Sequence, residues 1–198
     1  MKKIPTLFER EYKDHKVVGI KPIVTIGCEW VLEGKGIATI KYDGSCCAII
    51  NGEFYKRYDA KKGKQPPTGA IPCQQKPDPI TGHWPHWVKV SKENPADKWY
   101  IAALSFSLDL YLIDETCNAT YEAVGKHFQG NPYNMGFDML IKHGQDIIKN
   151  CPRSFEGLNN FLLNNKIEGI VFWKDGEPKC KIKRSDFGYT WGGDQNAN

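Results

Sequence analysis

Residues 37–58 read IATIKYDGSCCAIINGEFYKRY, and in this stretch short apolar runs are separated by two dipeptides typical of tight turns. An Asp-Gly pair stands at positions 43–44 and an Asn-Gly pair at positions 51–52. Such pairs favour hairpin turns, because both central residues of the turn need a positive φ. The stretch therefore predicts three paired antiparallel strands.

Outward from this stretch, four more segments have the length and apolar character of strands. They are residues 120–124, 138–142, 169–173 and 179–183. An Asp-Gly pair at positions 175–176 joins the last two, and Gly130-Asn131-Pro132 predicts a further turn.

One helix is predicted over residues 154–165. Ser154 is a suitable N-cap, and the apolar residues that follow it recur at helical spacing. Residues 101–113 fit either a helix or a strand. Residues 61–79 are rich in Pro, Gly, Lys and Gln and predict a long loop, which in a compact domain is usually functional or mobile.

The composition is that of an ordinary globular protein. The 198 residues are 40% hydrophobic and 25% charged, with a net charge of +4, which argues against collagen, coiled-coil and disordered classes. No apolar run reaches the ~18 residues that a membrane span needs, and the nearest candidate, residues 101–113, contains Asp109. We therefore expect no membrane segment.

The N-terminus and the cysteines point to a reducing compartment. Residues 1–13 lack the apolar core of a signal peptide, because Glu9, Arg10 and Glu11 interrupt them. The seven cysteines are odd in number and show no C-x-x-C spacing, which favours free thiols over disulfides or a zinc site. We expect the cytoplasm, with the nucleus left open.

Positive charge gathers in two segments. Residues 56–64 carry five basic side chains against Asp59, and residues 166–184 carry six against three acids. Such clusters suit a phosphate-rich partner such as a nucleotide or a nucleic acid. The alternative is two solvated surface faces.

The sequence Lys41-Tyr42-Asp43-Gly44 places a lysine at the end of an expected strand, directly before a turn. A lysine becomes a nucleophile when burial or neighbouring cations lower its pKa. A plain hairpin also explains this tetrapeptide, so a catalytic role for Lys41 depends on the other charged residues of the chain.

Four further charged residues stand in apolar strand sequence, where a charge is costly unless it is paired or functional. Glu122 lies within a predicted strand and Glu168 opens another. Lys181 and Lys183 alternate along a third strand, so both amines point to one face. Together with Lys41 they provide a candidate nucleophile, two acids and two amines.

This ordered set resembles the motif series of the covalent nucleotidyltransferases, the superfamily of ATP-dependent DNA and RNA ligases and mRNA capping enzymes. The series is KYDG at 41–44, Arg57, Glu122, EGIVF at 168–172 and KIK at 181–183. More closely, the chain resembles the 5′-to-3′ RNA ligases of vertebrates and some large viruses. That likeness lies in PDPITGHWP at 77–85, QGNPY at 129–133 and KIKR at 181–184.

The resemblance implies an α+β fold, a nucleotidyltransferase (ATP-grasp-like) domain of antiparallel sheets flanked by helices, with ATP in the cleft between them. Residues 1–190 would form this single domain and residues 191–198 a flexible tail. Only residues 184–198 follow Lys183, so we expect no C-terminal OB domain, which many members of the superfamily carry there. We expect a monomer.

The resemblance also implies the catalytic roles. Lys41 matches the nucleophile that attacks the α-phosphate of ATP, and Lys181 and Lys183 match the pair that contacts this phosphate. Glu168 matches the acid linked to the catalytic metal, Mg²⁺ or Mn²⁺, both of which prefer carboxylate and phosphate oxygens.

The remaining nucleotide contacts are carried over in the same way. Arg57 and Glu122 match the pair near the ribose and phosphate. His143 falls where the family has a residue stacked on the adenine, although that residue is aromatic in many members; Phe128 is the alternative.

Two segments are candidates for RNA contact. Lys61, Lys62 and Lys64 could bind phosphates, or could simply be a solvated loop. The aromatic residues of segment 83–87 could stack on unpaired bases, although an aromatic anchor for the long loop explains them better.

These expectations together predict an ATP-dependent RNA ligase. It would join RNA 5′-phosphate and 3′-hydroxyl ends through a lysyl-AMP and an RNA-adenylate, as in RNA repair. The alternatives are a DNA ligase or an mRNA capping guanylyltransferase with the same lysine chemistry, or a catalytically silent RNA-binding module.

Overall fold

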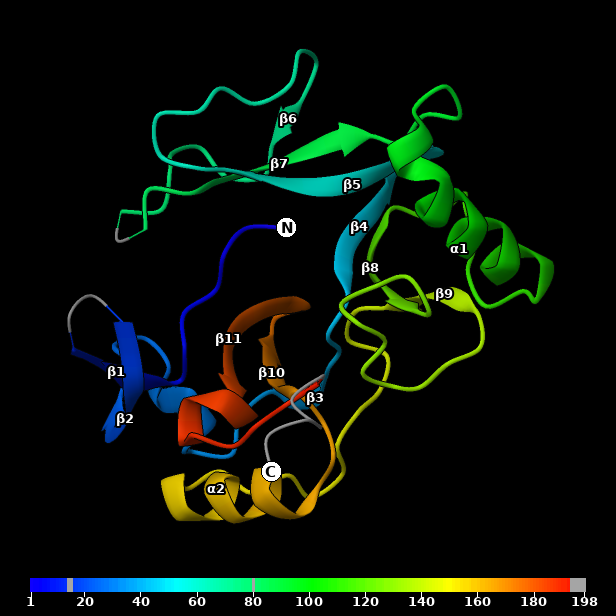
Figure 1. The fold of residues 1–198 in the computed structure, drawn as a ribbon. Coiled ribbons are helices and arrows are strands. Elements are labelled where there is room, and N and C mark those ends of the chain that lie inside the picture. Colours follow the sequence, from blue (N-terminus) through cyan, green and yellow to red (C-terminus); the bar gives the residue numbers. More distant parts are fainter. Residues whose placement is uncertain (14–15, 80, 193–198) are drawn as a thin grey trace. The chain divides into compact units, whose positions relative to one another are not determined.

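A computed structural model describes residues 1–13, 16–79 and 81–192, and within them the chain is an α+β protein with three antiparallel sheets and two α-helices (Figure 1). The chain divides into two compact units. The first unit comprises Met1–Lys3 and Asp43–His143, and the second unit comprises Ile4–Tyr42 and Gly144–Asn198.

The first unit is built on a six-stranded sheet in the order β6-β7-β5-β4-β8-β9. Its strands are β4 (Ser45–Ile50), β5 (Glu53–Ala60), β6 (Ile71–Pro72), β7 (Trp84–Lys89), β8 (Ala119–Gly125) and β9 (Asp138–Lys142). Helix α1 (Lys98–Asp109) follows the short 3-10 helix η2 (Pro95–Asp97) and packs against β9. The hydroxyl of Ser107 in α1 accepts a hydrogen bond from the Leu140 N–H in β9 at 2.8 Å.

The two predicted hairpin turns, at Asp43-Gly44 and Asn51-Gly52, have different outcomes. The hairpin at Asn51-Gly52 is confirmed, since β4 pairs with β5 and both turn residues have positive φ, 52° and 76°. The hairpin at Asp43-Gly44 is wrong, because the preceding strand β3 (Ile37–Lys41) pairs with β10 and not with β4. Gly44 is needed for close packing instead: a Cβ there would come within 2.2 Å of the Ala123 carbonyl oxygen.

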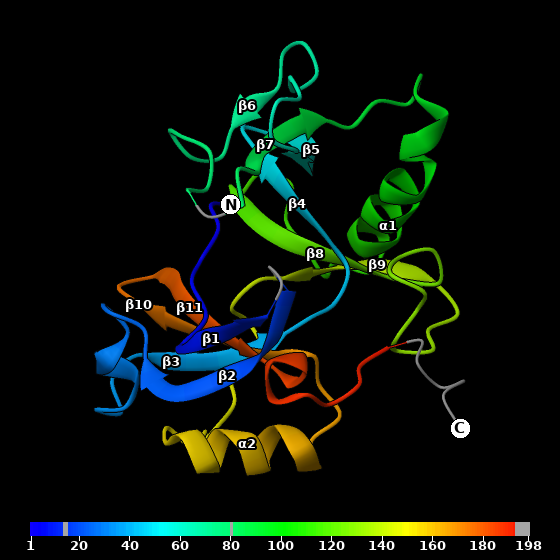
Figure 2. The same ribbon diagram turned by 60° about the vertical axis from the view of Figure 1, so that its left-hand side comes forward.

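The second unit contains two smaller sheets (Figure 2). Strands β1 (Phe8–Lys13) and β2 (Lys16–Val24) form a hairpin. Strand β10 (Gly169–Lys174) lies between β3 and β11 (Glu177–Lys183). Helix α2 (Phe155–Asn164) and the 3-10 helices η1 (Glu29–Val31) and η3 (Arg184–Phe187) complete the unit.

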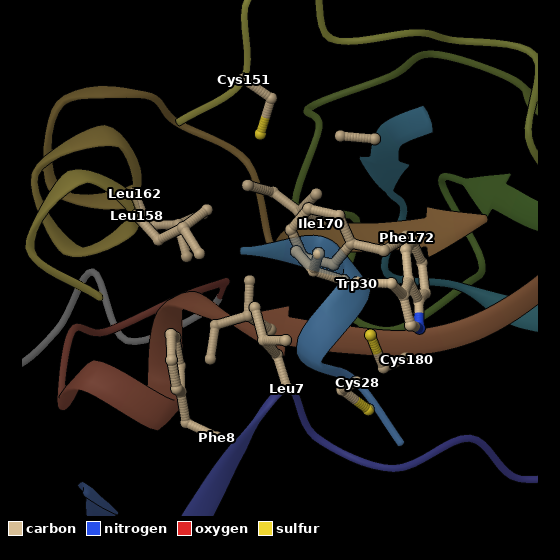
Figure 3. Close-up of a cluster of buried hydrophobic side chains, with 13 residues drawn as sticks. Leu7, Phe8, Cys28, Trp30, Cys151, Leu158, Leu162, Ile170, Phe172 and Cys180 are labelled. Carbon is tan, nitrogen blue, oxygen red and sulfur yellow. The ribbon is translucent and has the colours of Figure 1, made fainter. Parts of the chain in front are cut away.

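The core of the second unit gathers side chains from several of these elements (Figure 3). Leu158 and Leu162 of α2 are fully buried in the same cluster as Ile170 of β10 and Ile182 of β11. The helix begins as the sequence predicts, because the Ser154 hydroxyl accepts a hydrogen bond from the Gly157 N–H at 3.1 Å.

Most of the other local predictions are confirmed. The predicted strands are present as β8, β9, β10 and β11, and the Asp175-Gly176 turn joins the last two. The ambiguous segment 101–113 is helical as far as Asp109. In the predicted tail, residues 193–198 lie outside the described residues. No helix in the described part of the chain has the length and apolar character to cross a membrane.

Candidate active site

Lys41 is the last residue of β3, and the sheet sets it in one row with Gly169 and Lys183. Gly169 of β10 pairs with Lys41 on one side and with Lys183 of β11 on the other. Residues paired in this way project their side chains to the same face of a sheet. Because the central position is a glycine, no side chain stands between the two lysines.

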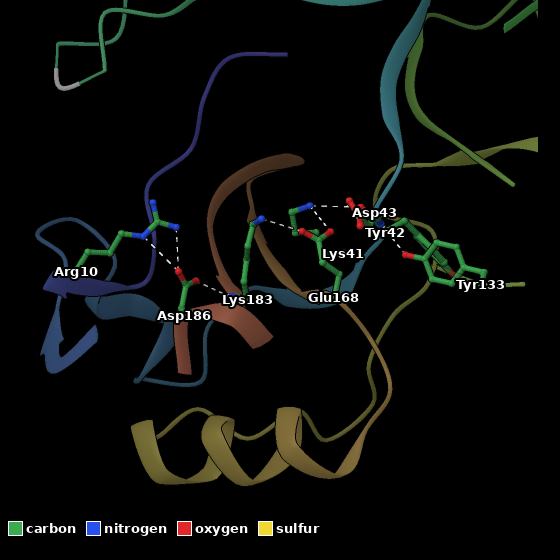
Figure 4. Close-up of polar contacts among 8 residues, drawn as sticks. All are labelled: Arg10, Lys41, Tyr42, Asp43, Tyr133, Glu168, Lys183 and Asp186. Carbon is green, nitrogen blue, oxygen red and sulfur yellow. Dashed lines mark hydrogen bonds and ion pairs between the residues drawn. The ribbon is translucent and has the colours of Figure 1, made fainter. Parts of the chain in front are cut away.

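Glu168 directly precedes β10, and its carboxylate contacts both amines (Figure 4). Glu168 Oε2 accepts a hydrogen bond from Lys41 Nζ at 2.5 Å, and Oε1 lies 2.9 Å from Lys183 Nζ. Glu168 is 5% exposed, and a buried carboxylate needs such partners to remain charged. The Lys41 and Lys183 side chains are 21% and 31% exposed. The cluster thus offers solvent a surplus of positive charge, which favours an anionic ligand.

Lys181 lies on the same face as this cluster, as the alternation along its strand predicts. It pairs with Val171, two residues along β10 from Gly169. Its main chain also holds the segment before β1, because the Lys181 N–H donates to the Pro5 carbonyl at 3.0 Å and its own carbonyl accepts from the Leu7 N–H at 2.7 Å. The three lysines carried over from the resemblance therefore share one face of a sheet.

Asp186 fixes the end of β11 and was missed by the sequence analysis. This aspartate is 3% exposed. Its Oδ2 accepts a hydrogen bond from the Lys183 N–H at 2.8 Å, and its Oδ1 forms an ion pair with Arg10 Nη2 at 2.9 Å (Figure 4). The only signal in the sequence is an acid three residues after Lys183, and Arg10 is remote from it in the chain. Both residues support the backbone from which Lys183 projects.

The other predicted nucleotide residues lie in the first unit. His143, just after β9, places Nε2 2.8 Å from Glu122 Oε2 on β8 and Nδ1 3.0 Å from Thr120 Oγ1. Both edges of the imidazole are therefore held. Arg57 on β5 donates to Asp59 Oδ2 at 3.0 Å. Within this unit the structure brings Glu122 and His143 into direct contact.

Phe128, the alternative stacking residue, belongs to the core. It is 4% exposed and packs edge-on against Tyr100, with ring centroids 5.2 Å apart. A ring enclosed in this way offers no face to a nucleotide, so His143 is the better of the two candidates.

Cys46 joins this group, and no sequence motif had singled it out. It pairs with Glu122 between β4 and β8, and its Sγ, a Glu122 carboxylate oxygen and a His143 ring nitrogen all lie within 4.8 Å of one another. Burial raises the pKa of Cys46 to about 12, and Glu122 contributes in the same direction.

The pKa of Arg57 is raised by its anionic surroundings. Burial alone would lower the pKa of Arg57, but Cys46, Asp59 and Glu122 outweigh this effect and raise that pKa.

Two carboxylates could therefore take part in holding a metal ion. Glu122 belongs to the one group of three metal-ligating side chains found among the described residues, with Cys46 and His143. Glu168 fits Mg²⁺ differently, since this ion often binds through one carboxylate while phosphate oxygens and water supply its other ligands. Such an ion would share the Glu168 carboxylate with the two lysines or reach it through water.

The two segments of the first unit that are candidates for RNA contact differ in exposure. Lys61, Lys62 and Lys64 are exposed on the loop between β5 and β6. Trp84 Nε1 donates to the Gln74 carbonyl, in the loop between β6 and β7, at 2.7 Å, and Trp87 is 6% exposed. These contacts support the interpretation of the aromatic segment as an anchor for the loop.

Comparison with known proteins gives one consistent result. RNA ligase 1 of Pongo abelii is 24% identical to this chain over 253 aligned positions, which cover 92% of this chain and 76% of the relative. RNA ligase 1 of Rattus norvegicus is 25% identical, with the same shares of both proteins covered. No protein-family model matches the chain. The chain is a distant homologue of vertebrate RNA ligase 1, in agreement with the resemblance seen in its motifs.

Proposed function

We propose that this distant homologue of vertebrate RNA ligase 1 is an ATP-dependent RNA ligase that works through a covalent lysyl-AMP at Lys41. One observation carries the proposal: the buried Glu168 carboxylate holds the amines of Lys41 and Lys183 at 2.5 and 2.9 Å. This contact places three groups together: Lys41 as the nucleophile, Glu168 as the proton acceptor and Lys183 as the cation for the phosphate.

In the first step, Lys41 Nζ attacks the α-phosphorus of ATP. A phosphorus–nitrogen bond forms, the bond to the bridging oxygen breaks, and pyrophosphate leaves with the electron pair. Before the attack, the Lys41 ammonium gives one proton to Glu168 Oε2, its hydrogen-bond partner, and from there to solvent, which frees the lone pair of the amine. A second proton leaves the nitrogen for solvent once the phosphorus–nitrogen bond has formed. Lys183 and Lys181, on the same face, stabilise the negative charge that gathers on the phosphate oxygens.

The two later steps repeat this chemistry at phosphorus. AMP passes from Lys41 to the RNA 5′-phosphate, which frees the amine, and the RNA 3′-hydroxyl then attacks the activated phosphate and expels AMP. Each step makes one bond to phosphorus and breaks another. The same cationic face can therefore serve all three steps.

The metal, nucleotide and RNA contacts are assigned to other side chains. A bound Mg²⁺ or Mn²⁺ ion would neutralise phosphate charge, and we assign it to Glu168. Arg57 and Glu122 are assigned to the ribose and phosphate, and His143 to the adenine. The exposed lysines Lys61, Lys62 and Lys64 are assigned to RNA phosphates.

We further propose that residues 1–190 act as one nucleotidyltransferase domain in a monomeric enzyme of RNA repair. All seven cysteines are free thiols in the structure, which supports a site of action in the cytoplasm or nucleus, where thiols stay reduced.

The first test is labelling of the protein with α-³²P-ATP and, separately, α-³²P-GTP, in Mg²⁺ buffer. We expect acid-labile, alkali-stable label from ATP alone, and none in Lys41→Arg, which keeps the charge facing Glu168 but cannot act as the nucleophile. The matched control is Lys89→Arg, an exposed lysine paired with Glu53, which should label normally. Label from GTP would favour a capping enzyme, and no label from either nucleotide would favour a silent RNA-binding module.

The second test concerns the nucleic acid. Sealing of nicked and single-stranded RNA is compared with sealing of the matching DNA strands. Preferential sealing of RNA supports the proposal, whereas equal or better sealing of DNA would make the protein a DNA ligase.

A further inference from the structure

The group formed by Cys46, Glu122 and His143 is not needed in full by the proposed chemistry, because that chemistry has no role for a thiol. Cys46 and Glu122 are direct cross-strand neighbours on β4 and β8. The main-chain N–H of His143 donates to the Thr120 carbonyl at 3.0 Å, which holds the histidine beside the same strand. Three different donor types therefore converge from β4, from β8 and from the residue that follows β9.

The spacing of these donors suits a small tetrahedral ion. Zinc bonds of about 2.0–2.3 Å put neighbouring ligand atoms about 3.3–3.8 Å apart. The donor atoms here all lie within 4.8 Å of one another, and His143 Nε2 is 2.8 Å from Glu122 Oε2. Side-chain shifts of about 1 Å would bring the three to zinc-binding distances.

The donor set is also selective. A thiolate, an imidazole and a carboxylate together favour Zn²⁺, whereas Mg²⁺ prefers oxygen ligands alone. With three protein ligands, a fourth position remains for water. The side chains of His143 and Glu122 are 17% and 12% exposed, which leaves an ion a route from solvent.

The surroundings of the site can adapt to the ion. The Thr120 hydroxyl lies 3.0 Å from His143 Nδ1 and can either donate to that nitrogen or accept from it. When it accepts from Nδ1–H, the Nε2 lone pair is available to the metal, an arrangement common around zinc-bound histidines.

The charges also balance. A thiolate and a carboxylate neutralise a divalent cation, and the nearby Arg57 guanidinium is already paired with Asp59 at 3.0 Å. Binding releases the Cys46 thiol proton to solvent and forms one metal–sulfur bond.

We propose that Cys46, Glu122 and His143 form a Zn²⁺-binding site in the first unit. A consequence that rests on the proposed function follows, since that function assigns Glu122 and His143 to the nucleotide. Zinc bound to these two side chains prevents them from contacting ATP, so zinc inhibits formation of the lysyl-AMP.

The binding test uses Zn²⁺ itself, in competition with a chromophoric chelator and without nucleotide. We expect one tight site in the wild-type protein and an affinity at least about 100-fold weaker in Cys46→Ser and in His143→Asn. The matched control is Cys117→Ser, which removes an exposed thiol 3.2 Å from an Asp114 oxygen and should bind as the wild type does.

A second measurement needs no variant at the site itself. Co²⁺ added to the wild-type protein should give the charge-transfer absorption of a cobalt–thiolate bond, and Cys117→Ser should retain it. The proposal is overturned if Cys46→Ser binds Zn²⁺ as tightly as the wild type, if Cys117→Ser loses the tight site, or if no cobalt–thiolate band appears.

Labelling by ATP in the presence of Zn²⁺ tests the zinc site separately from the proposed function. Zn²⁺ should suppress labelling by ATP in the wild type and should do so far less in Cys46→Ser. If zinc binds through Cys46 but labelling continues unchanged, the zinc site stands and the assignment of Glu122 and His143 to the nucleotide is wrong.

Discussion

Replacing Glu168 by glutamine removes the negative charge that two ammonium groups share, while the size of the side chain is kept. In the wild type the two carboxylate oxygens lie 2.5 Å from Lys41 Nζ and 2.9 Å from Lys183 Nζ, and Glu168 is 5% exposed. Glu168→Gln would leave two neighbouring cations facing an amide. We therefore expect the second unit to lose stability.

The magnitude follows from the burial of the three groups. Removing one partner of a fully buried ion pair costs about 3–5 kcal/mol. Lys41 and Lys183 are 21% and 31% exposed and regain part of their hydration, so we expect a loss of about 2–3 kcal/mol. For a chain of this length each kcal/mol lowers the Tm by about 2–4 °C, which predicts a decrease of about 4–12 °C.

The assay is thermal and urea unfolding at pH 7, followed by tryptophan fluorescence. Lys183→Met should cost less than Glu168→Gln, because the Lys41–Glu168 pair survives it. Glu53→Gln removes a carboxylate from an exposed pair with Lys89 and should leave the Tm nearly unchanged. If Glu168→Gln melts at the same temperature as Glu53→Gln, or at a higher temperature than Lys183→Met, the Glu168 carboxylate does not stabilise the second unit in this way.

Three further predictions concern other parts of the chain. Gly44→Ala should destabilise the protein by about 2–3 kcal/mol in urea unfolding, since its Cβ would come within 2.2 Å of a carbonyl oxygen of β8; Gly52→Ala, which meets no atom within 4 Å, should cost only the about 1 kcal/mol of its positive φ. Ser154→Ala should cost about 1 kcal/mol in the same assay, because it removes the N-cap of α2. With its pKa raised to about 12, Cys46 is a neutral thiol at pH 7–9. Iodoacetamide should therefore label Cys46 far more slowly than the exposed Cys117, and the labelling rate of Cys46 should rise about tenfold per pH unit. Equal labelling rates of the two cysteines, measured by peptide mass spectrometry, would contradict this.

Local patterns were sufficient wherever a structure depends on nearby residues. Asn51-Gly52 predicts its hairpin because the turn itself demands positive φ, and Ser154 predicts the start of α2 because the cap bonds within the first turn. The strand at 138–142 is found with the predicted bounds. Neither the Asn51-Gly52 turn nor the Ser154 cap depends on a distant partner.

The hairpin at Asp43-Gly44 failed because strand pairing is a long-range choice. Residues 37–41 carry apolar side chains at Ile37, Ala38 and Ile40, a pattern that fits a strand beside β4 or a strand in another sheet. The structure pairs them with β10, and no feature within residues 37–58 indicates this. The Asp-Gly dipeptide is explained by the tight packing of Gly44 against β8.

The candidate site was predictable only in part for the same reason. Lys41, Glu168 and Lys183 stand out because charges at the ends of apolar strands need partners, and the structure brings them into contact. Asp186 and Cys46 carry no such signal: an acid after a strand usually caps a turn, and a lone cysteine in a strand is usually a core residue. Their roles depend on residues that only the fold brings near.

The proposed function requires that the amine of Lys41 forms a covalent bond to AMP. The most direct measurement is incubation with ATP and Mg²⁺, digestion under alkaline conditions that preserve a phosphoramidate, and location of the adenylate by tandem mass spectrometry. We expect a single adenylate, on Lys41. An unmodified protein, or an adenylate on Lys181 or Lys183 with Lys41 free, would contradict it.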